Sequence, residues 1–194
     1  MEMSAALIEK ELIRPLKRRE YDRLAADGYF EDERVELLFG MVVETPPIDQ
    51  AHIVSTNLVR KLLESALGDR ATVLSPSAFA ASDISEPEPD VMVVPPDVSW
   101  DEHPSTAYLV VEVARRSLRR DRGLKAVLYG ESDVEEYWIV NHVDGVIEVF
   151  RDRSPDGWRS HAVHGRGERV AMARFPDVTI AVDDVLPPHR VEPG

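Results

Sequence analysis

Two carboxylates and a lysine follow one another between residues 88 and 125, in a pattern that could support phosphodiester hydrolysis. Asp90 opens the apolar run VMVV, and Glu112 lies near the end of a second apolar run, YLVVEV. Lys125 ends the basic run that follows. Hydrolysis of a phosphodiester requires an activated water and stabilisation of negative charge, and magnesium supplies both when one or two carboxylates hold it. A lysine nearby could orient the water or offset charge in the transition state.

The elements that carry these residues must bring them together. Val91–Val94 and Ala107–Val113 are short apolar runs typical of buried strands, and a loop with two successive prolines joins them. If the two strands pair, both acids become neighbours although they are far apart in sequence. A helix predicted from Arg119 to about Glu131 could then direct the lysine back towards the strand ends.

Each of the three residues also has a simpler interpretation. Asp90 could be a turn residue, because aspartate favours turns. Lys125 could be an ordinary exposed lysine of a helix. Glu112 is harder to explain in this way, because a carboxylate inside a buried strand is costly unless it is paired or bound to a metal.

The segments before residue 70 predict two helices and a pair of strands. A helix is expected over Leu16–Ala26, and two short strands are expected around Phe39-Gly40 within Arg34–Glu44. A second helix should begin after an Asp49 N-cap and end at Gly68. Its apolar residues at helical spacing, which predict its buried face, are Ile53, Val54, Leu58, Leu62 and Leu67.

The remaining segments add strands, so the chain should fold as a mixed α/β (α+β) domain. Ala71–Ala80 has a strand-like pattern, and Tyr137–Val140 and Val146–Phe150 flank an Asp-Gly pair that predicts a hairpin. Weaker strands near Ser160–Val163 and Arg169–Ala173 could extend that sheet. We expect a lead-in at 1–15, a single domain over 16–186 and a flexible tail at 187–194.

Composition narrows the class of protein. The chain has 194 residues, of which 43% are hydrophobic and 30% charged, so a sizeable core is expected and global disorder is not. The absence of cysteine excludes disulfides, thiolate zinc sites and a cysteine nucleophile, and it fits a reducing cytosol. No apolar run approaches the roughly 18 residues of a membrane span, and the N-terminus does not read as a signal peptide. We therefore expect a cytoplasmic protein without a membrane partner.

The charge is unevenly distributed. A net charge of −13 argues against nucleic-acid binding, because phosphate affinity depends on lysine and arginine. Residues 115–125, however, contain five arginines and one lysine against one aspartate. This run is either a solvated surface or a set of phosphate contacts beside the acids. The candidate phosphate contacts are Arg115, Arg116, Arg119, Arg120 and Arg122.

Five segments resemble a known family when they are taken in order. They are VELLFGMVVE, EPDVMVV, YLVVEV, RRDRGLKAVLYG and VEEYWIVNHVDGVIEVFR, and they resemble the Uma-two family of bacterial proteins regarded as endonucleases. Pro89-Asp90 followed by Glu112 resembles the PD-(D/E)xK signature of restriction-endonuclease-like nucleases. The resemblance extends from about Leu16 to Phe150. It implies a mixed central sheet flanked by helices, with extra C-terminal strands, and a magnesium-dependent nuclease site.

The resemblance also assigns individual residues. The superfamily pattern places its lysine two residues after the second acid, where this chain has Ala114, whereas the family match places it at Lys125. Glu36 matches the acid of the early strand pair, which could help to hold metal or water. His52 matches a histidine that begins the second helix. Without the resemblance, Glu36 could equally face solvent and His52 could be a surface or capping residue.

Two departures from the family pattern stand close to these residues. The family has an aspartate where this chain has Asn141, and Ser-Pro-Ser-like residues where this chain has Ala114 to Ser117. The second departure introduces two arginines beside the candidate site. It could strengthen phosphate binding or indicate a different partner.

The sequence therefore supports the hypothesis of an endonuclease that uses Mg²⁺, or Mn²⁺, to hydrolyse DNA. Asp90, Glu112 and the carbonyl of Val113 would hold the metal, and Lys125 would position the water. Because one such site cuts one strand, cleavage of both strands would favour a homodimer. The alternative is a nuclease-like scaffold without catalysis that acts as a binding or regulatory module. A glycosidase built on the two acids is a weaker alternative, because it gives the lysine no role.

Overall fold

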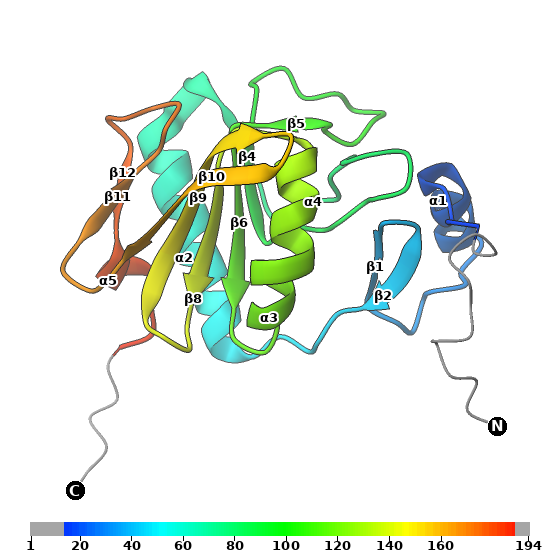
Figure 1. The fold of residues 1–194 in the computed structure, drawn as a ribbon, viewed down its shortest axis with the longest axis horizontal. Helices are drawn as coiled ribbons and strands as arrows, with labels where there is room; N and C mark the ends of the chain where they lie inside the picture. Colours follow the sequence, from blue (N-terminus) through cyan, green and yellow to red (C-terminus); the bar gives the residue numbers. More distant parts are fainter. Residues whose placement is uncertain (1–13, 189–194) are drawn as a thin grey trace, which may run out of the picture.

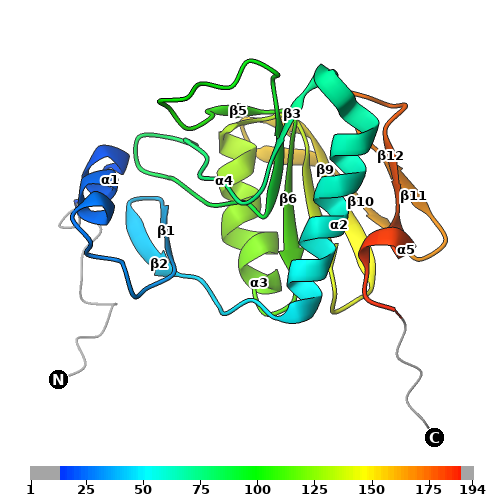
Figure 2. The same cartoon turned by 180° about the vertical axis from the view of Figure 1, so that it is seen from behind.

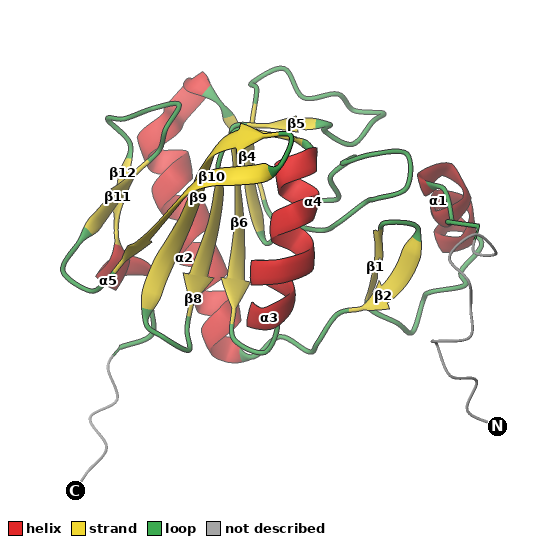
Figure 3. Ribbon diagram, in the orientation of Figure 1, coloured by secondary structure: helices red, strands yellow, loops and turns green. Residues whose placement is uncertain are grey.

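A central sheet with helices on both faces organises residues 14–188, the part of the chain that the computed structural model describes (Figures 1 and 3). The lead-in and the tail expected at 1–15 and 187–194 fall almost entirely outside this part. No helix within it is both long and apolar enough to cross a membrane. The mixed α/β class expected from the sequence is confirmed.

The central sheet has six strands in the order β10-β9-β8-β6-β4-β3. These strands are β3 (Thr72–Leu74), β4 (Val91–Val94), β6 (Leu109–Ala114), β8 (Tyr137–Asn141), β9 (Val146–Ser154) and β10 (Gly157–His164). β6 and β8 are parallel, and all other neighbours in the sheet are antiparallel. The pairing of β4 with β6 confirms that the two acid-bearing strands are adjacent.

Helices cover the two faces unequally. The long helix α2 (Gln50–Leu67) lies on one face. The other face carries one continuous helical segment made of α3 (Leu118–Arg120), the π-helical turn η4 (Asp121–Lys125) and α4 (Ala126–Glu131). Figures 1 and 2 show the sheet between these layers from opposite sides.

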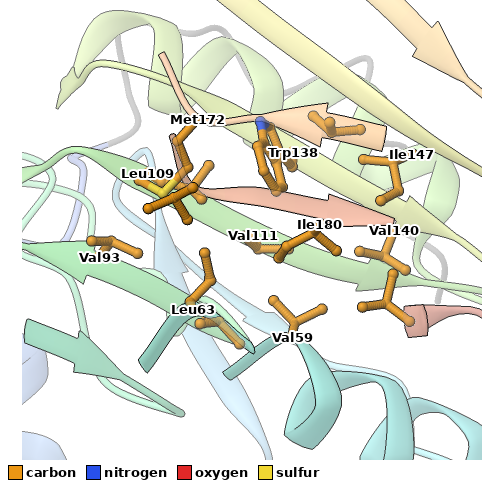
Figure 4. Close-up of a cluster of buried hydrophobic side chains, with 14 of the residues drawn as sticks. Val59, Leu63, Val93, Leu109, Val111, Trp138, Val140, Ile147, Met172 and Ile180 are labelled. Atoms are coloured by element: carbon orange, nitrogen blue, oxygen red, sulfur yellow. The ribbon is translucent and has the colours of Figure 1, made fainter. Parts of the chain in front are cut away.

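The alternation of side chains along β6 divides the core in two. Val111 and Val113 join a cluster that includes Val59 and Leu63 of α2, part of which is shown in Figure 4. Val110 and Ala114 point to the opposite face and pack in the cluster that contains Leu128 and Tyr129 of α4. Because neighbouring strand residues face opposite sides, Glu112 lies on the α4 side of the sheet.

The remaining elements lie around the central sheet and its two helical layers. They are α1 (Arg18–Ala26), β1 (Val35–Leu38), β2 (Met41–Glu44), η3 (Gly68–Arg70), β5 (Thr106–Ala107), β7 (Asp133–Val134), β11 (Arg169–Ala171), β12 (Thr179–Ala181) and α5 (Val182–Val185). β1 and β2 form the hairpin predicted around Phe39-Gly40. This hairpin and α1 stand beside the central sheet as a separate outlying unit (Figure 1).

The ends of α2 match the prediction, and its buried face matches it in part. The Asp49 carboxylate accepts a hydrogen bond from the N–H of His52, and Gly68 forms the C-terminal cap with a φ of 55°. The face that packs on the sheet consists of Ser55, Val59, Leu63 and Leu67. Of the predicted residues, Leu67 is buried and Leu62 is partly buried against the core. Ile53, Val54 and Leu58 are exposed. Apolar residues lie on more than one side of the helix. Packing against the sheet decides which of them are buried, and spacing along the sequence identified that side only in part.

Two predicted strands also differ from the structure. Ala71–Ala80 contributes only the three residues of β3, after which the chain leaves the sheet and Phe79 bonds to the backbone of Pro87. Ser160–Val163 lies in β10 and extends the sheet as expected, but β11 pairs with β12 instead. That second pair buries Val170 and Ile180 against the core under α2. Burial of these apolar side chains is the physical reason why β11 folds over the face of the sheet.

Candidate active site

The register of β4 and β6 brings the two predicted acids to the same end of the sheet. Val91 pairs with Val111, so Asp90 lies beside the end of β6. Its Oδ2 accepts a hydrogen bond from the N–H of Val113 at 2.7 Å, directly after Glu112. The convergence that the sequence predicts for Asp90 and Glu112 is present in the structure.

The helical segment delivers the lysine through a local irregularity. The N–H of Ala126 donates to the carbonyl of Asp121, five residues earlier, which makes this stretch a π turn. Lys125 lies at the end of that turn with only 2% of its surface exposed. Its Nζ donates to Glu112 Oε1 at 2.8 Å and to Glu36 Oε1 at 2.7 Å. The prediction that a helix would bring the lysine back to the strand ends is therefore confirmed as geometry.

Glu36 faces the site and not solvent. All four residues of β1 are buried, so the strand has no solvent-facing side. Besides Lys125, the Oε1 atom of Glu36 accepts a hydrogen bond from the N–H of Glu88 at 2.8 Å. The outlying hairpin thus contributes one acid to a cluster whose other members come from the sheet and the helix.

Burial and charge act against each other in this cluster. Burial raises the pKa of Glu112 above its ordinary value, although the charge of Lys125 lowers it. Burial alone would lower the pKa of Lys125, but the charges of Glu112 and Glu36 outweigh it, and the pKa is raised. The hydroxyl of Tyr129 also donates to Glu112 Oε1 at 2.7 Å. The lysine is accordingly held as an ammonium ion.

His52 lies in the first turn of α2 and contacts the first acid. Its Nε2 is 2.8 Å from Asp90 Oδ1. Burial lowers the pKa of His52, but the hydrogen bond to Asp90 and the charge of that carboxylate leave the pKa above its ordinary value. The resemblance matched this histidine to one that begins the second helix, and the structure places it beside Asp90.

A cavity of about 300 Å³ joins these side chains. It lies between the outlying hairpin unit and the carboxylates of the sheet. Glu36, Asp90, Glu112 and Lys125 all line it, as does His52. The residues that the sequence grouped together therefore line one cavity, whereas their chemical roles remain a prediction.

The basic run divides between this cavity and its surroundings. Arg115, Arg116 and Arg120 line the cavity, and Arg119 lines a shallower hollow next to it. Arg122 lines neither, because its guanidinium is bound to Glu148 and Asp144.

Two of the cavity arginines already have partners. Arg115 pairs with Asp49 at 2.8 Å, and Arg120 donates to the carbonyl of Glu44 at 2.8 Å. Arg34, which precedes β1, lines the cavity as well. The sequence reasoning missed Arg34 because it lies far from the basic run in the sequence.

Asp121 is a second cavity residue that sequence reasoning missed. It is 1% exposed, and its Oδ1 has no hydrogen-bond partner within residues 14–188. Burial raises its pKa, although the charge of Lys125 lowers it. The available signal was an aspartate four residues before Lys125, a spacing that places two side chains on one face of a helix.

The arrangement fits a divalent cation by its charges. Glu36, Asp90, Glu112 and Asp121 bring four carboxylates to the cavity, and Lys125 is the buried cation among them. The buried Oε2 of Glu36 also has no hydrogen-bond partner in the described part of the chain. Between residues 14 and 188, no three His, Asp or Glu side chains form a group that could hold a metal ion by themselves. Magnesium does not require such a group, because one or two carboxylates with waters and a substrate phosphate suffice.

Comparison with known proteins supports the resemblance drawn from the sequence. The fold is similar to the crystal structure of a "putative nuclease" from Anabaena variabilis ATCC 29413, with a TM-score of 0.71 over 88% of this chain and 97% of that chain. At 12% identity this likeness shows a shared fold. A search of curated proteins found no match. The sequence model of the Uma2 family, described as "Putative restriction endonuclease", matches residues 18–183. The resemblance to the Uma-two family is thereby confirmed, and the chain belongs to this family.

Proposed function

We propose that this protein is a magnesium-dependent endonuclease that hydrolyses phosphodiester bonds of DNA. The observation that carries the proposal is the position of Lys125, buried between Glu112 and Glu36 in a cavity that Asp90 also lines. Membership of the Uma2 family supports the nuclease class. The metal, the DNA substrate and the residue roles are proposals that rest on the site itself.

Asp90, Glu112 and the Val113 carbonyl would hold Mg²⁺, with Mn²⁺ as a substitute. The ion would supply an activated water and charge stabilisation at the phosphate. The hydrogen bond from the Val113 N–H fixes the Asp90 carboxylate against the end of β6. His52 orients the other oxygen of that carboxylate from α2. These contacts would limit reorganisation when a substrate arrives.

Lys125 would orient the attacking water and offset charge at phosphorus, and Glu36 would assist by holding the ammonium group in place. An ammonium ion fixed by two carboxylates presents its remaining proton in a defined direction. Such fixed donors are more effective inside a cavity than in bulk water.

The arginines around the cavity would contact phosphates. Arg116 and Arg120 are best placed, because both line the cavity and the hollow beside it. Arg115 and Arg119 would extend the contact to either side. Arg122 could reach a phosphate only by giving up Glu148 and Asp144. For cleavage of both strands, two such sites would have to act together, which favours a homodimer.

A non-catalytic nuclease-like module is the second candidate. The observation in its favour is that both carboxylate oxygens of Asp90 are engaged, one by His52 and one by the backbone of Val113. The net charge of −13 also opposes tight binding of nucleic acid. A module of this kind would bind a partner without cutting it.

Incubation with supercoiled plasmid DNA and Mg²⁺ tests the proposal. The wild-type protein should nick the plasmid, whereas Glu112→Ala and Lys125→Ala should not. Glu131→Gln, which changes an exposed acid of α4, is the matched control and should nick at the wild-type rate. No nicking by any protein, or equal nicking by all four, would favour the non-catalytic module.

A further inference from the structure

Hydrolysis at this site needs a group that accepts a proton from the attacking water. Lys125 cannot serve, because an ammonium ion bound to two carboxylates at 2.7 and 2.8 Å has no lone pair to offer. In the same contacts, Glu36 Oε1 and Glu112 Oε1 each accept a hydrogen bond from Lys125. The acceptor must therefore be sought among the other cavity groups.

Asp90 and His52 are engaged with each other. The 2.8 Å contact between His52 Nε2 and Asp90 Oδ1 occupies one oxygen of the acid, and the Val113 N–H occupies the other. Glu112 carries two donors on Oε1, since the Tyr129 hydroxyl joins the lysine there. Glu36 keeps a buried Oε2 without a hydrogen-bond partner in the described part of the chain, but its carboxylate is ion-paired with Lys125, as is that of Glu112. An ion pair with an ammonium group stabilises the charged carboxylate and makes it a weaker proton acceptor.

Asp121 differs from these residues in its contacts. It lines the same cavity, is 1% exposed and forms no ion pair with any residue of the described range 14–188. Its Oδ1 is buried and accepts no hydrogen bond from that part of the chain, which leaves a carboxylate oxygen with free lone pairs. The hydroxyl of Ser117 lies near the carboxyl group and lowers its pKa, but burial has the larger effect and raises it. A raised pKa brings an acid closer to that of an efficient base near neutral pH.

The π turn explains why Asp121 can share the site with Lys125. The turn spans Asp121–Lys125, and both ends of it are buried against the cavity. A π turn costs helix stability and recurs at functional sites. Here it brings an acid and an ammonium group to one wall without an ion pair between them within the described residues.

We propose that Asp121 is the catalytic proton acceptor of this site. This inference rests on the proposed nuclease function. The oxygen of the water forms a bond to phosphorus while one of its protons passes to the Asp121 carboxylate. The bond from phosphorus to the leaving sugar oxygen breaks with its electron pair on that oxygen, which takes up a proton from solvent. Asp121 then releases its proton to solvent, so atoms and charge balance over the cycle.

Single-turnover cleavage of plasmid DNA by Asp121→Asn and Asp121→Ala tests the assignment. Both variants should cleave about 100- to 10,000-fold more slowly, the usual contribution of a general base. Mn²⁺ binding by calorimetry should be unchanged in both, because Asp121 is not assigned to the metal. Added formate should restore part of the rate of Asp121→Ala, since a small carboxylate can enter the space left in the cavity. Formate should not accelerate the wild-type protein or Lys125→Ala.

Three results would overturn the assignment. One is a rate for Asp121→Asn within about threefold of wild type, far below the contribution of a general base. Another is loss of Mn²⁺ binding, which would make Asp121 a metal ligand. The third is a folded Asp121→Ala that formate does not rescue, which would indicate a structural role. Failure of the wild-type protein to cleave would instead overturn the nuclease function, so the two failures are distinguishable.

Discussion

Two buried glutamates of this protein, Glu136 and Glu112, have opposite surroundings. Glu136 is fully buried, and both of its carboxylate oxygens have donors. Its Oε1 accepts hydrogen bonds from Trp138 Nε1 at 2.8 Å and from Arg151 Nε at 2.6 Å. Its Oε2 accepts one from the N–H of Ala173 at 2.8 Å. One negative charge thus meets one positive charge and a full set of donors.

The cluster around Glu112 is not balanced in this way. Lys125 is its buried cation, whereas Glu36, Glu112 and Asp121 are its buried acids. One oxygen of Glu36 and one of Asp121 have no partner in the part of the chain that the structure describes. Unsatisfied buried carboxylates are costly and are retained where another ligand or a reaction uses them. The comparison teaches that the balance of a buried charge, more than its burial, separates a structural ion pair from a candidate active site.

The largest expected effect is the loss of activity in Glu112→Gln. Nicking of plasmid DNA should fall about 100- to 1,000-fold, the cost of losing one electrostatic contact to the transition state. The free energy of unfolding should not fall, because the amide oxygen can still accept from Lys125 and Tyr129 while an excess buried charge is removed. Urea unfolding and a nicking assay on the same preparation measure both quantities. A large loss of stability would place Glu112 with the structural glutamates.

Glu136→Gln should show the reverse pattern. The amide replaces one acceptor oxygen with a donor, which then faces Arg151 or the N–H of Ala173. A hydrogen bond to a charged group contributes about 1.5–3 kcal/mol, so the free energy of unfolding should fall by about 3 kcal/mol. The Tm should fall by roughly 6–12 °C in a calorimetric scan. The nicking rate at 25 °C should stay at the wild-type value, and a drop of the size seen in Glu112→Gln would break the comparison.

Glu86 is a third buried acid, with one arginine nearby, and its titration should make the stability of the fold depend on pH. Burial and the nearby Asp22 raise the pKa of Glu86 from 4.5 to about 7, although Arg18 lowers it. The folded state therefore holds a proton that the unfolded state has lost between pH 4.5 and about 7, and stability should fall as pH rises through this window.

Substitution isolates the contribution of Glu86. Glu86→Gln should match the wild-type protein near pH 5 and should exceed its free energy of unfolding by about 2–3 kcal/mol at pH 8. Urea unfolding at the two pH values measures the difference. An equal difference between the two proteins at both pH values would show that Glu86 does not titrate in this window.

The smallest expected effect separates two arginines of the basic run. Arg116→Gln should weaken DNA binding about tenfold and reduce the slope of affinity against salt by about one, because a phosphate contact is lost. Arg122→Gln should leave that slope unchanged and lower stability instead, since Glu148 is 1% exposed and loses a partner. Fluorescence anisotropy without divalent cations measures binding. Equal salt slopes for the two variants would contradict the assignment of Arg116 to phosphate contact and of Arg122 to a structural ion pair.

The sequence predicted the parts of the site that depend on local patterns. The apolar runs around Asp90 and Glu112 predicted adjacent buried strands, because a short uninterrupted apolar run is typical of a strand with two covered faces. The Asp49 cap and Gly68 predicted both ends of α2. Lys125 followed from the family resemblance together with the predicted helix, and its position in the structure agrees.

Other parts depended on contacts between distant segments. The buried face of α2 is set by the sheet, which contacts Val59 and Leu63 and leaves Ile53 exposed. The burial of Glu36 depends on the outlying hairpin facing the helix that carries Lys125. The π turn, which brings Asp121 into the cavity, has no local signature that spacing rules recognise. Pairwise packing across the fold decides such features.

Binding of a divalent cation tests the central claim most directly. Titration calorimetry with Mg²⁺ and Mn²⁺ should show binding to the wild-type protein and to Glu136→Gln, because Glu136 is already balanced by Arg151. Binding should be lost in Asp90→Asn and Glu112→Gln. The account would be contradicted if the wild-type protein bound neither ion, or if all four proteins bound them equally.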